Sequence, residues 1–183
     1  MKKKPAVLTI GHSTRSLEEF VSLLKSYGVE KVVDVRTIPR SRHNPQFNMD
    51  TLAIFLRRRG IGYFHMKGLG GLRHALKDSL NTGWLNSSFR GFADYMQTEE
   101  FEESLKKLIE TAETKRVALM CAEAVPWRCH RSLIADALSV RGMEVTHIMS
   151  AASRHAHSIT SFARIRGKRI TYPAERQAKE GVK

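Results

Sequence analysis

The stretch "RVALMCAEAVPWRCHRSLIADALSVRGMEVTHIM", residues 116–149, decides the fold. It opens with the apolar, β-prone run Val117–Cys121 and closes with a second such run, Glu144–Met149. Between them, Ser132–Val140 has the pattern of a helix and is followed by Gly142, a residue type that commonly ends helices. The order strand, helix, strand predicts a βαβ unit, in which a helix crosses one face of the sheet between two parallel strands.

A second unit of the same kind is predicted at the start of the chain. Ala6–Ile10 is apolar and β-prone, and Ser16 with Glu19 three residues later forms a capping box that starts helices. The helical pattern runs to Gly28, after which "KVVDVR" opens the second strand. Two βαβ units in one chain favour a mostly parallel sheet.

The middle of the chain links these two units. The stretch "TIPRSRHNPQFNMD", residues 37–50, is longer than a plain connection needs, and Asp50 is predicted to cap the next helix. A third strand is expected at Gly62–Met66, and a helix at about Thr98–Ala112. We therefore predict an α/β fold, a single domain with a mostly parallel, doubly wound sheet of about five strands flanked by helices. The α/β part covers residues 1–150, and residues 151–183 form a basic extension of the same domain with a flexible end.

Charge and composition restrict the partners. The net charge is +13 and the pI is about 10.1, which favours an anionic small molecule or nucleic acid. The sequence has no run of about 18 apolar residues and no signal peptide. We therefore expect no membrane partner and a cytoplasmic location. Two cysteines are too few for a disulfide framework. Nothing in the sequence specifies a cofactor or an oligomeric state.

Polar side chains gather where the predicted strands end. Ligands of open parallel sheets bind at the carboxyl ends of the strands, beside the point where the strand order reverses. With the frequent order 3-2-1-4-5, that reversal would bring "GHSTR" next to "CAEAVPWRCHR". The strand ends carry His12, Ser13 and Arg15 after the first strand, Asp34 and Arg36 after the second, and Cys121 and Glu123 after the fourth.

Cys129 is the candidate nucleophile. It stands where the helix should begin, between Arg128 and His130 and one residue before Arg131. Helix amides and positive neighbours favour a thiolate over a thiol. The alternative is a small residue that only fills space under the loop. Cys121 is a second catalytic candidate, although its place at a strand end equally suits a core residue.

The remaining polar residues have two interpretations each. His12 offers a general base or a packing residue, and Ser13 and Arg15 offer an anion contact at the following helix. Asp34 is best explained by an ion pair with Arg15, Arg36 or Arg131. The turn "KGLGG", residues 67–71, is weak evidence for a phosphate site.

A metal site is a further alternative. Cys121, Cys129, His130 and His12 are all suitable ligand types, but the two cysteines are farther apart than in usual structural zinc motifs. We therefore expect no metal, and a disulfide between the two cysteines also stays open. In the tail, "SFARIRGKRITYP", residues 161–173, mixes cations with Phe162 and Tyr172, a composition suited to single-stranded nucleic acid or to ordinary surface.

Three motifs carry a family resemblance. "TIGHSTR" (9–15), "VVDVRTIPRSRHNPQFN" (32–48) and "LMCAEAVPWRCHRSLIADAL" (119–138) follow one another at distances that resemble the domain-of-unknown-function 488 family, over about residues 7–150. The resemblance implies a compact α/β domain from bacteria and archaea, and no reaction. The family's recurring polar positions correspond to Gly11, His12, Ser13, Asp34, Arg36, Pro39, Cys121, Glu123, Cys129, His130 and Arg131.

The leading hypothesis from the sequence is an enzyme acting on an anionic substrate. Cys129 would serve as nucleophile or redox thiol, and His12 or Glu123 would move protons. The anion would be held by Ser13, Arg15, Arg36, Arg128, His130 and Arg131. The competing hypotheses are a non-catalytic nucleic-acid-binding module, whose binding would weaken steeply with salt, and a metal-dependent hydrolase.

Overall fold

The computed structural model describes residues 5–174, and its centre is one six-stranded sheet. The strands stand in the order β3-β2-β4-β1-β5-β6; all neighbouring pairs are parallel except β5 and β6. The strands are β1 (Ala6–Gly11), β2 (Lys31–Asp34), β3 (Gly62–His65), β4 (Val117–Cys121), β5 (Glu144–Ile148) and β6 (Arg154–Ala156). A separate antiparallel hairpin follows, made of β7 (Arg164–Arg166) and β8 (Arg169–Thr171).

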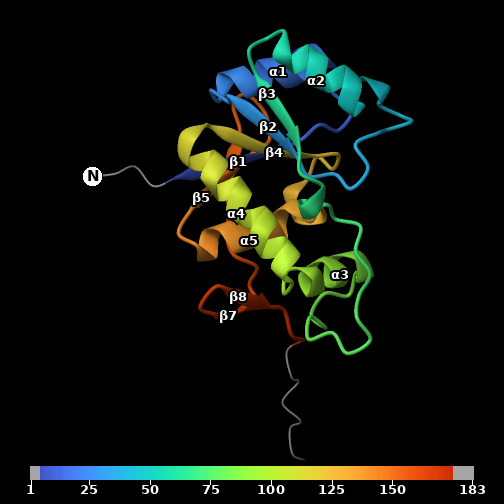
Figure 1. Cartoon of the computed structure of the whole chain (residues 1–183), viewed down its shortest axis with the longest axis vertical. Coiled ribbons are helices and arrows are strands. Elements are labelled where there is room, and N and C mark those ends of the chain that lie inside the picture. The colour runs from blue at the N-terminus through green and yellow to red at the C-terminus, as the bar shows by residue number, and fades with distance from the viewer. Residues whose placement is uncertain (1–4, 175–183) are drawn as a thin grey trace, which may run out of the picture.

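Helices cover both faces of the sheet (Figure 1). They are α1 (Leu17–Ser26), α2 (Met49–Arg57), α3 (Ser87–Tyr95), α4 (Glu99–Thr114) and α5 (Arg131–Val140). Side chains alternate between the faces along each strand: Leu8 packs with α1 and α2, while Val7 packs with α3, α4 and α5. The same alternation separates Ala118 from Leu119. The two resulting cores confirm the predicted doubly wound α/β fold.

The predicted strand order was wrong in one respect. In the structure β4 lies between β2 and β1, whereas the order 3-2-1-4-5 would have paired strands one and two directly. β1 and β4 are both apolar and buried on both faces, so either suits a central position and the sequence pattern cannot rank them. The adjacency of strands one and four does hold, and Gly11 stands opposite Cys121.

Several element boundaries differ from the sequence prediction. The capping box of α1 is formed, with Ser16 Oγ accepting from the Glu19 N–H at 3.1 Å and Glu19 Oε2 accepting from the Ser16 N–H at 2.9 Å. Asp50 does not cap α2: the helix begins one residue before it, with Asn48 at the cap position. Helix α3 was not predicted; its N-cap, Asn86, accepts from two backbone N–H groups.

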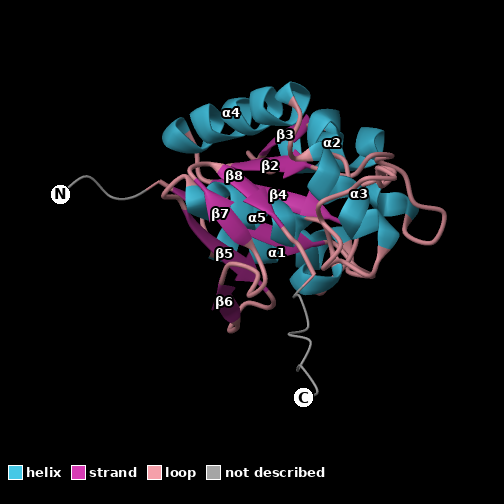
Figure 2. Cartoon of the chain, turned by 90° about the horizontal axis from the view of Figure 1, so that it is seen from below, coloured by secondary structure: helices cyan, strands magenta, loops and turns pink. Residues whose placement is uncertain are grey.

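The basic segment after residue 150 is built against the sheet up to Ala174. β6 extends the sheet at its β5 edge (Figure 2). Ile170 and Tyr172 are buried in the core beside α3, α4 and α5. Tyr172 donates to Asp136 in α5 at 2.8 Å, and its ring packs at 6.0 Å from that of Phe162. The expected flexible end, residues 175–183, lies outside the described residues. Within residues 5–174 none of the helices is long and apolar enough to cross a bilayer.

Candidate active site

The loops after β1 and β4 meet at the carboxyl edge of the sheet. β1 continues into α1 on one face and β4 into α5 on the other, which is the arrangement that opens a crevice in doubly wound sheets. The His12 and Ser13 N–H groups donate to the Cys121 and Ala122 carbonyls, both at 2.9 Å, so the pairing runs past the strand ends. A Cβ at Gly11 would lie 2.0 Å from the Glu123 carbonyl oxygen. Glycine at this position allows the two loops to approach each other.

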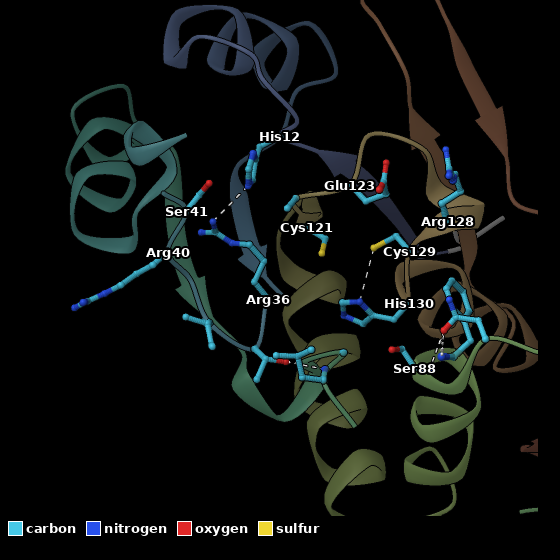
Figure 3. Close-up of a pocket in the computed structure, with 17 residues that line it drawn as sticks. His12, Arg36, Arg40, Ser41, Ser88, Cys121, Glu123, Arg128, Cys129 and His130 are labelled. Carbon is cyan, nitrogen blue, oxygen red and sulfur yellow. Dashed lines mark hydrogen bonds between the residues drawn. The ribbon is translucent and has the colours of Figure 1, made fainter. Parts of the chain in front are cut away.

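A cavity of about 490 Å³ lies at this edge (Figure 3). Its walls come from the ends of β1, β2 and β4, from the turn before α5 and from the start of α3. Among the predicted site residues it is lined by His12, Arg36, Cys121, Glu123, Arg128, Cys129 and His130. Ser13, Arg15, Asp34 and Arg131 do not line it.

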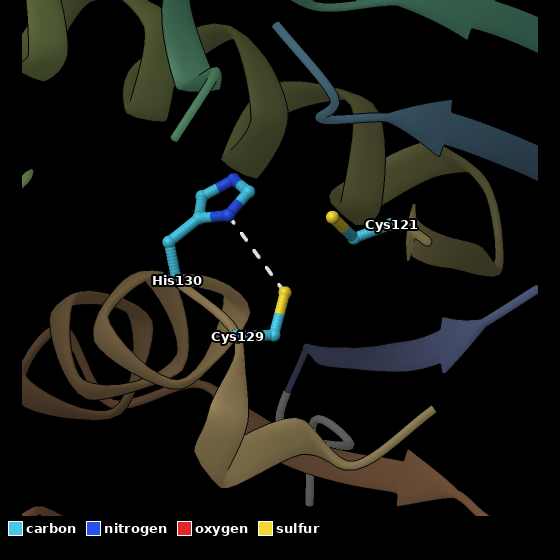
Figure 4. A group of neighbouring side chains, drawn as sticks. All are labelled: Cys121, Cys129 and His130. Atoms are coloured by element: carbon cyan, nitrogen blue, oxygen red, sulfur yellow. Dashed lines mark hydrogen bonds between the residues drawn. The ribbon is translucent and has the colours of Figure 1, made fainter. Parts of the chain in front are cut away.

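Cys129 and His130 form a close pair on the cavity wall. Cys129 is extended, at φ −134° and ψ 144°, and His130 is the N-cap residue of α5. This change of backbone direction turns two consecutive side chains toward each other, and Cys129 Sγ lies 3.7 Å from His130 Nδ1 (Figure 4). Cys129 is buried apart from 5% of its surface. From the sequence, Cys129 was predicted as the nucleophile, whereas His130 was considered as an anion contact or a metal ligand and not as a base.

The imidazole of His130 is held in one orientation. Its Nε2 lies 3.0 Å from both the Val35 and Leu69 carbonyl oxygens, which can only accept, so Nε2 carries the hydrogen and donates. Nδ1 then faces the Cys129 sulfur with its lone pair whenever the ring is neutral. Gly71 packs directly on the ring: a Cβ there would lie 2.4 Å from Nδ1. The glycine-rich turn therefore admits the histidine ring, a role that the sequence analysis did not consider for it.

The environment of Cys129 favours its ionised form. A hydrogen bond with the Cys121 thiol, a hydrogen bond with His130 and the positive charges of His130 and Arg131 lower the pKa of Cys129, although burial opposes them. The same hydrogen bond, together with burial, raises the pKa of the Cys121 thiol. Of the two thiols, Cys129 is thus the one that ionises more readily.

A buried ion pair forms the opposite wall. Arg36 donates from Nε to Asp34 Oδ1 at 2.9 Å and from Nη2 to Oδ2 at 2.6 Å, and Tyr63 donates to the same Oδ2 at 2.6 Å. Of the three arginines considered for Asp34, Arg36 is the one that pairs with it. Because its charge is matched by this carboxylate, Arg36 adds little net positive potential to the cavity.

His12 is a neutral part of this wall. Its Nδ1 donates to the Ser13 carbonyl at 2.8 Å, and its Nε2 faces Arg36 Nη1 at 3.4 Å. Burial lowers the pKa of His12 to about 4, and its ring stacks on Phe47 at 4.2 Å. Both nitrogens are engaged, which favours a packing and hydrogen-bonding role over that of a base.

Two other predicted anion-binding arginines hold the loops in place. Arg131 is buried and donates to the Glu123 carbonyl and, at 3.2 Å, to Thr9 Oγ1. Arg15 donates to the carbonyls of Gly11 and Met149. Their guanidinium groups fix the loops that shape the cavity.

Cations at the rim surround the cavity mouth. Arg40 and Arg128 are exposed, line the cavity and lie on opposite sides of it in Figure 3, with Glu123 also exposed near Arg128. The sequence analysis did not single out Arg40, although it belongs to the loop noted as longer than a connection needs. It also missed Asn86, Ser88 and Phe89, because the α3 region carries no recognisable motif.

The sequence matches a known protein family over more than half of its length. The model of a domain of unknown function, DUF488, matches residues 16–138. The chain belongs to the DUF488 family. The match is somewhat shorter than the expected residues 7–150; it includes Cys121, Cys129 and His130 and begins after His12. No curated protein and no solved structure matches the chain. The DUF488 assignment leaves substrate and reaction open.

Proposed function

We propose that this DUF488 protein is an enzyme that uses Cys129 as a nucleophile against an anionic substrate. One observation carries the proposal: Cys129 Sγ lies 3.7 Å from His130 Nδ1, and that imidazole is oriented by two backbone carbonyls at 3.0 Å. A nucleophile, a base and a group that orients the base constitute the general arrangement of covalent catalysis. The pair opens onto a cavity large enough for a small metabolite.

The proposed reaction begins with a proton transfer. Cys129 gives its thiol proton to His130 Nδ1, and the resulting imidazolium is stabilised by the carbonyls of Val35 and Leu69. The thiolate sulfur then bonds to an electrophilic centre of the substrate, and the leaving group departs with the proton from Nδ1. Water or a second substrate attacks the intermediate and regenerates the thiol. Hydrolase and transferase outcomes share these steps.

Electrostatics support an anionic substrate. The cavity rim carries Arg40 and Arg128, and Cys129 directly precedes the N-cap residue of α5, the end of the helix that carries a partial positive charge. Glu123 adds one negative charge to the same lining, which is fewer than the positive charges of these two arginines. In the refined assignment Arg40 and Arg128 attract the anion, His130 is the base in place of His12, and Arg36 shapes the wall.

The composition of the C-terminal segment gives less support to nucleic acid. Its cations, Arg164, Arg166, Lys168 and Arg169, are exposed on the β7–β8 hairpin. The aromatic residues that would stack on bases pack elsewhere: Tyr172 is fully buried, and Phe162 packs against Trp84 at 4.9 Å. A small anionic molecule is therefore the substrate class that we propose.

The test compares two alkylating reagents that differ in charge. Reduced, metal-free protein is treated with neutral iodoacetamide or anionic iodoacetate at pH 6 and low salt, and adducts are located by peptide mass. We expect Cys129 to react at least about tenfold faster than glutathione, because at this pH a thiol with a lowered pKa keeps far more of its ionised form than glutathione does. The ratio of iodoacetate to iodoacetamide rates should also exceed that of glutathione, because the rim attracts the anion.

Single substitutions test which residues cause the fast alkylation and the preference for the anionic reagent. Cys129→Ser should abolish the fast adduct, and His130→Gln should slow it. Arg40→Gln and Arg128→Gln should lower the rate ratio, whereas Arg57→Gln, an exposed arginine of α2 that does not line the cavity, should leave it unchanged. A Cys129 rate equal to that of glutathione would refute the nucleophile, and an unaltered ratio would refute the anionic substrate.

A further inference from the structure

We propose that Cys121, Cys129 and His130 bind a thiophilic divalent cation of the zinc class, and that the bound cation masks the nucleophile. The three residues come from the end of β4 and the start of α5, and Figure 4 shows their side chains converging on one point. Their ligand atoms, two Sγ and one Nδ1, all lie within 4.8 Å of one another. The masking rests on the proposed function; the metal site does not.

The distances are close to those of a tetrahedral zinc site. Zinc bond lengths of about 2.3 Å to sulfur and about 2.0 Å to nitrogen place neighbouring tetrahedral ligand atoms roughly 3.5–3.8 Å apart. Cys129 Sγ and His130 Nδ1 are already 3.7 Å apart. All pairs lie within 4.8 Å, so shifts of about 1 Å at the side chains complete the geometry.

The histidine is prepared for this role. A metal-bound histidine usually donates its other ring N–H to a carbonyl or carboxylate, which fixes the tautomer. His130 Nε2 donates to Val35 and Leu69, and therefore presents the Nδ1 lone pair toward the sulfurs. The Gly71 backbone against the ring leaves little room for another orientation.

The identity of the donors selects the ion. Two sulfurs and one imidazole nitrogen favour zinc and disfavour magnesium or calcium, which prefer oxygen ligands. All three residues line the cavity, so the fourth coordination position faces it. The two cysteines are separated by seven residues, more than in usual structural zinc motifs, but the fold brings the end of β4 and the turn before α5 together so that both can bind one ion.

Binding of the ion at this site would control the activity of the proposed enzyme. Zinc draws electron density from a bound thiolate and so lowers its nucleophilicity, and His130 Nδ1, when bonded to the ion, can no longer accept the thiol proton. Cys121 is a ligand in the proposed metal site, whereas in the proposed reaction its thiol only donates a hydrogen bond to the Cys129 sulfur. Cys121→Ser removes a sulfur ligand and keeps a hydroxyl group that can donate to Cys129, so its effect on metal binding should be much larger than its effect on the metal-free reactivity of Cys129.

The experiment is a titration of reduced, metal-free, full-length protein with Co²⁺, followed by competition with Zn²⁺ against a chromophoric chelator. We expect one Co²⁺ per chain, with sulfur-to-cobalt charge-transfer bands in the near ultraviolet and the visible bands of tetrahedral cobalt. Cys121→Ser, Cys129→Ser and His130→Gln should each weaken binding by at least about tenfold. His12→Gln, which changes a cavity histidine outside the ligand set, should bind like the wild type.

Alkylation with and without one equivalent of Zn²⁺ links the site to the nucleophile. Each protein is compared with its own metal-free sample: zinc should slow alkylation of Cys129 in the wild type and should change the rate little in Cys121→Ser, which lacks one ligand. No binding, or cobalt bound without sulfur charge transfer, would overturn the metal site while leaving the alkylation result intact. Tight binding to a protein whose metal-free Cys129 reacts no faster than glutathione would overturn the proposed function and retain the site.

Discussion

At the scale of single residues, function depends on how tightly a few atoms are placed. Cys129 and His130 are neighbours in the sequence, and only the turn from extended to helical backbone between them brings sulfur and nitrogen to 3.7 Å. Residue types and charges identified Cys129 as the candidate nucleophile. They could not identify His130 as its partner, because the two carbonyls and the glycine that orient the ring come from residues 35, 69 and 71.

Gly71→Ala tests that placement. The added methyl group would lie 2.4 Å from His130 Nδ1, so the ring must move and the Cys129–His130 contact must lengthen. We expect alkylation of Cys129 to slow severalfold and cobalt affinity to fall, with secondary structure retained in circular dichroism. The matched control is Gly142→Ala, whose Cβ meets nothing within 4 Å; its positive φ of 81° costs stability without touching the site. Equal alkylation rates in Gly71→Ala and the wild type would contradict the role given to this glycine.

At the scale of elements, local sequence signals placed the starts and ends of most helices and strands. The strand Val117–Cys121 was predicted with its exact bounds, and the capping box at Ser16 fixed the start of α1. The sequence prediction missed the starts of two helices that have asparagine at the N-cap position. Asn48 and not Asp50 precedes α2, and α3 begins at an asparagine cap inside a stretch without clear periodicity.

Ser16→Ala measures how much the cap contributes. The substitution removes the acceptor of the Glu19 N–H and keeps the backbone N–H of residue 16 that donates to Glu19 Oε2. We expect the free energy of unfolding in urea to fall by about 1 kcal/mol. Ser22→Ala, an exposed position within the same helix, should leave it unchanged or raise it slightly. A Ser16→Ala loss no larger than the change for Ser22→Ala would show that the cap adds nothing to stability.

At the scale of the whole molecule, burial of ionisable side chains couples stability to pH. His12 directly follows β1 and lies beside Arg36. His147 in β5 is hydrogen-bonded to Thr9 at 2.7 Å and to His157 at 3.0 Å. Burial is the main cause that lowers the pKa of each to about 4. Nearby cations reinforce it: Arg36 acts on His12, and His157 and Arg131 act on His147.

The sign of the effect follows from proton binding. The unfolded chain protonates these histidines near pH 6.5, whereas the folded chain does so only near pH 4. Stability is therefore complete above pH 6.5 and falls as the pH drops from 6.5 to 4. We expect urea unfolding to show a loss of roughly 2 kcal/mol per histidine between pH 7 and pH 5. His12→Gln should make this pH dependence about half as steep, and equal stabilities at the two pH values would disprove the coupling.

The sequence by itself determined the fold class, most of the elements, the family and the candidate nucleophile. These follow from information that is local in the chain: apolar periodicity, caps, glycines at helix ends, and the charges next to Cys129. The tertiary structure alone decided the order of β1 and β4, the partner of Asp34, the orientation of the imidazole beside Cys129 and the convergence of Cys121 with Cys129 and His130. The reason is physical. The strand order and the approach of Cys121 to Cys129 depend on how buried strands of equal apolar character pack between their helices. Asp34 with Arg36 and Cys129 with His130 are close in sequence, but hydrogen bonds to residues of other segments orient them.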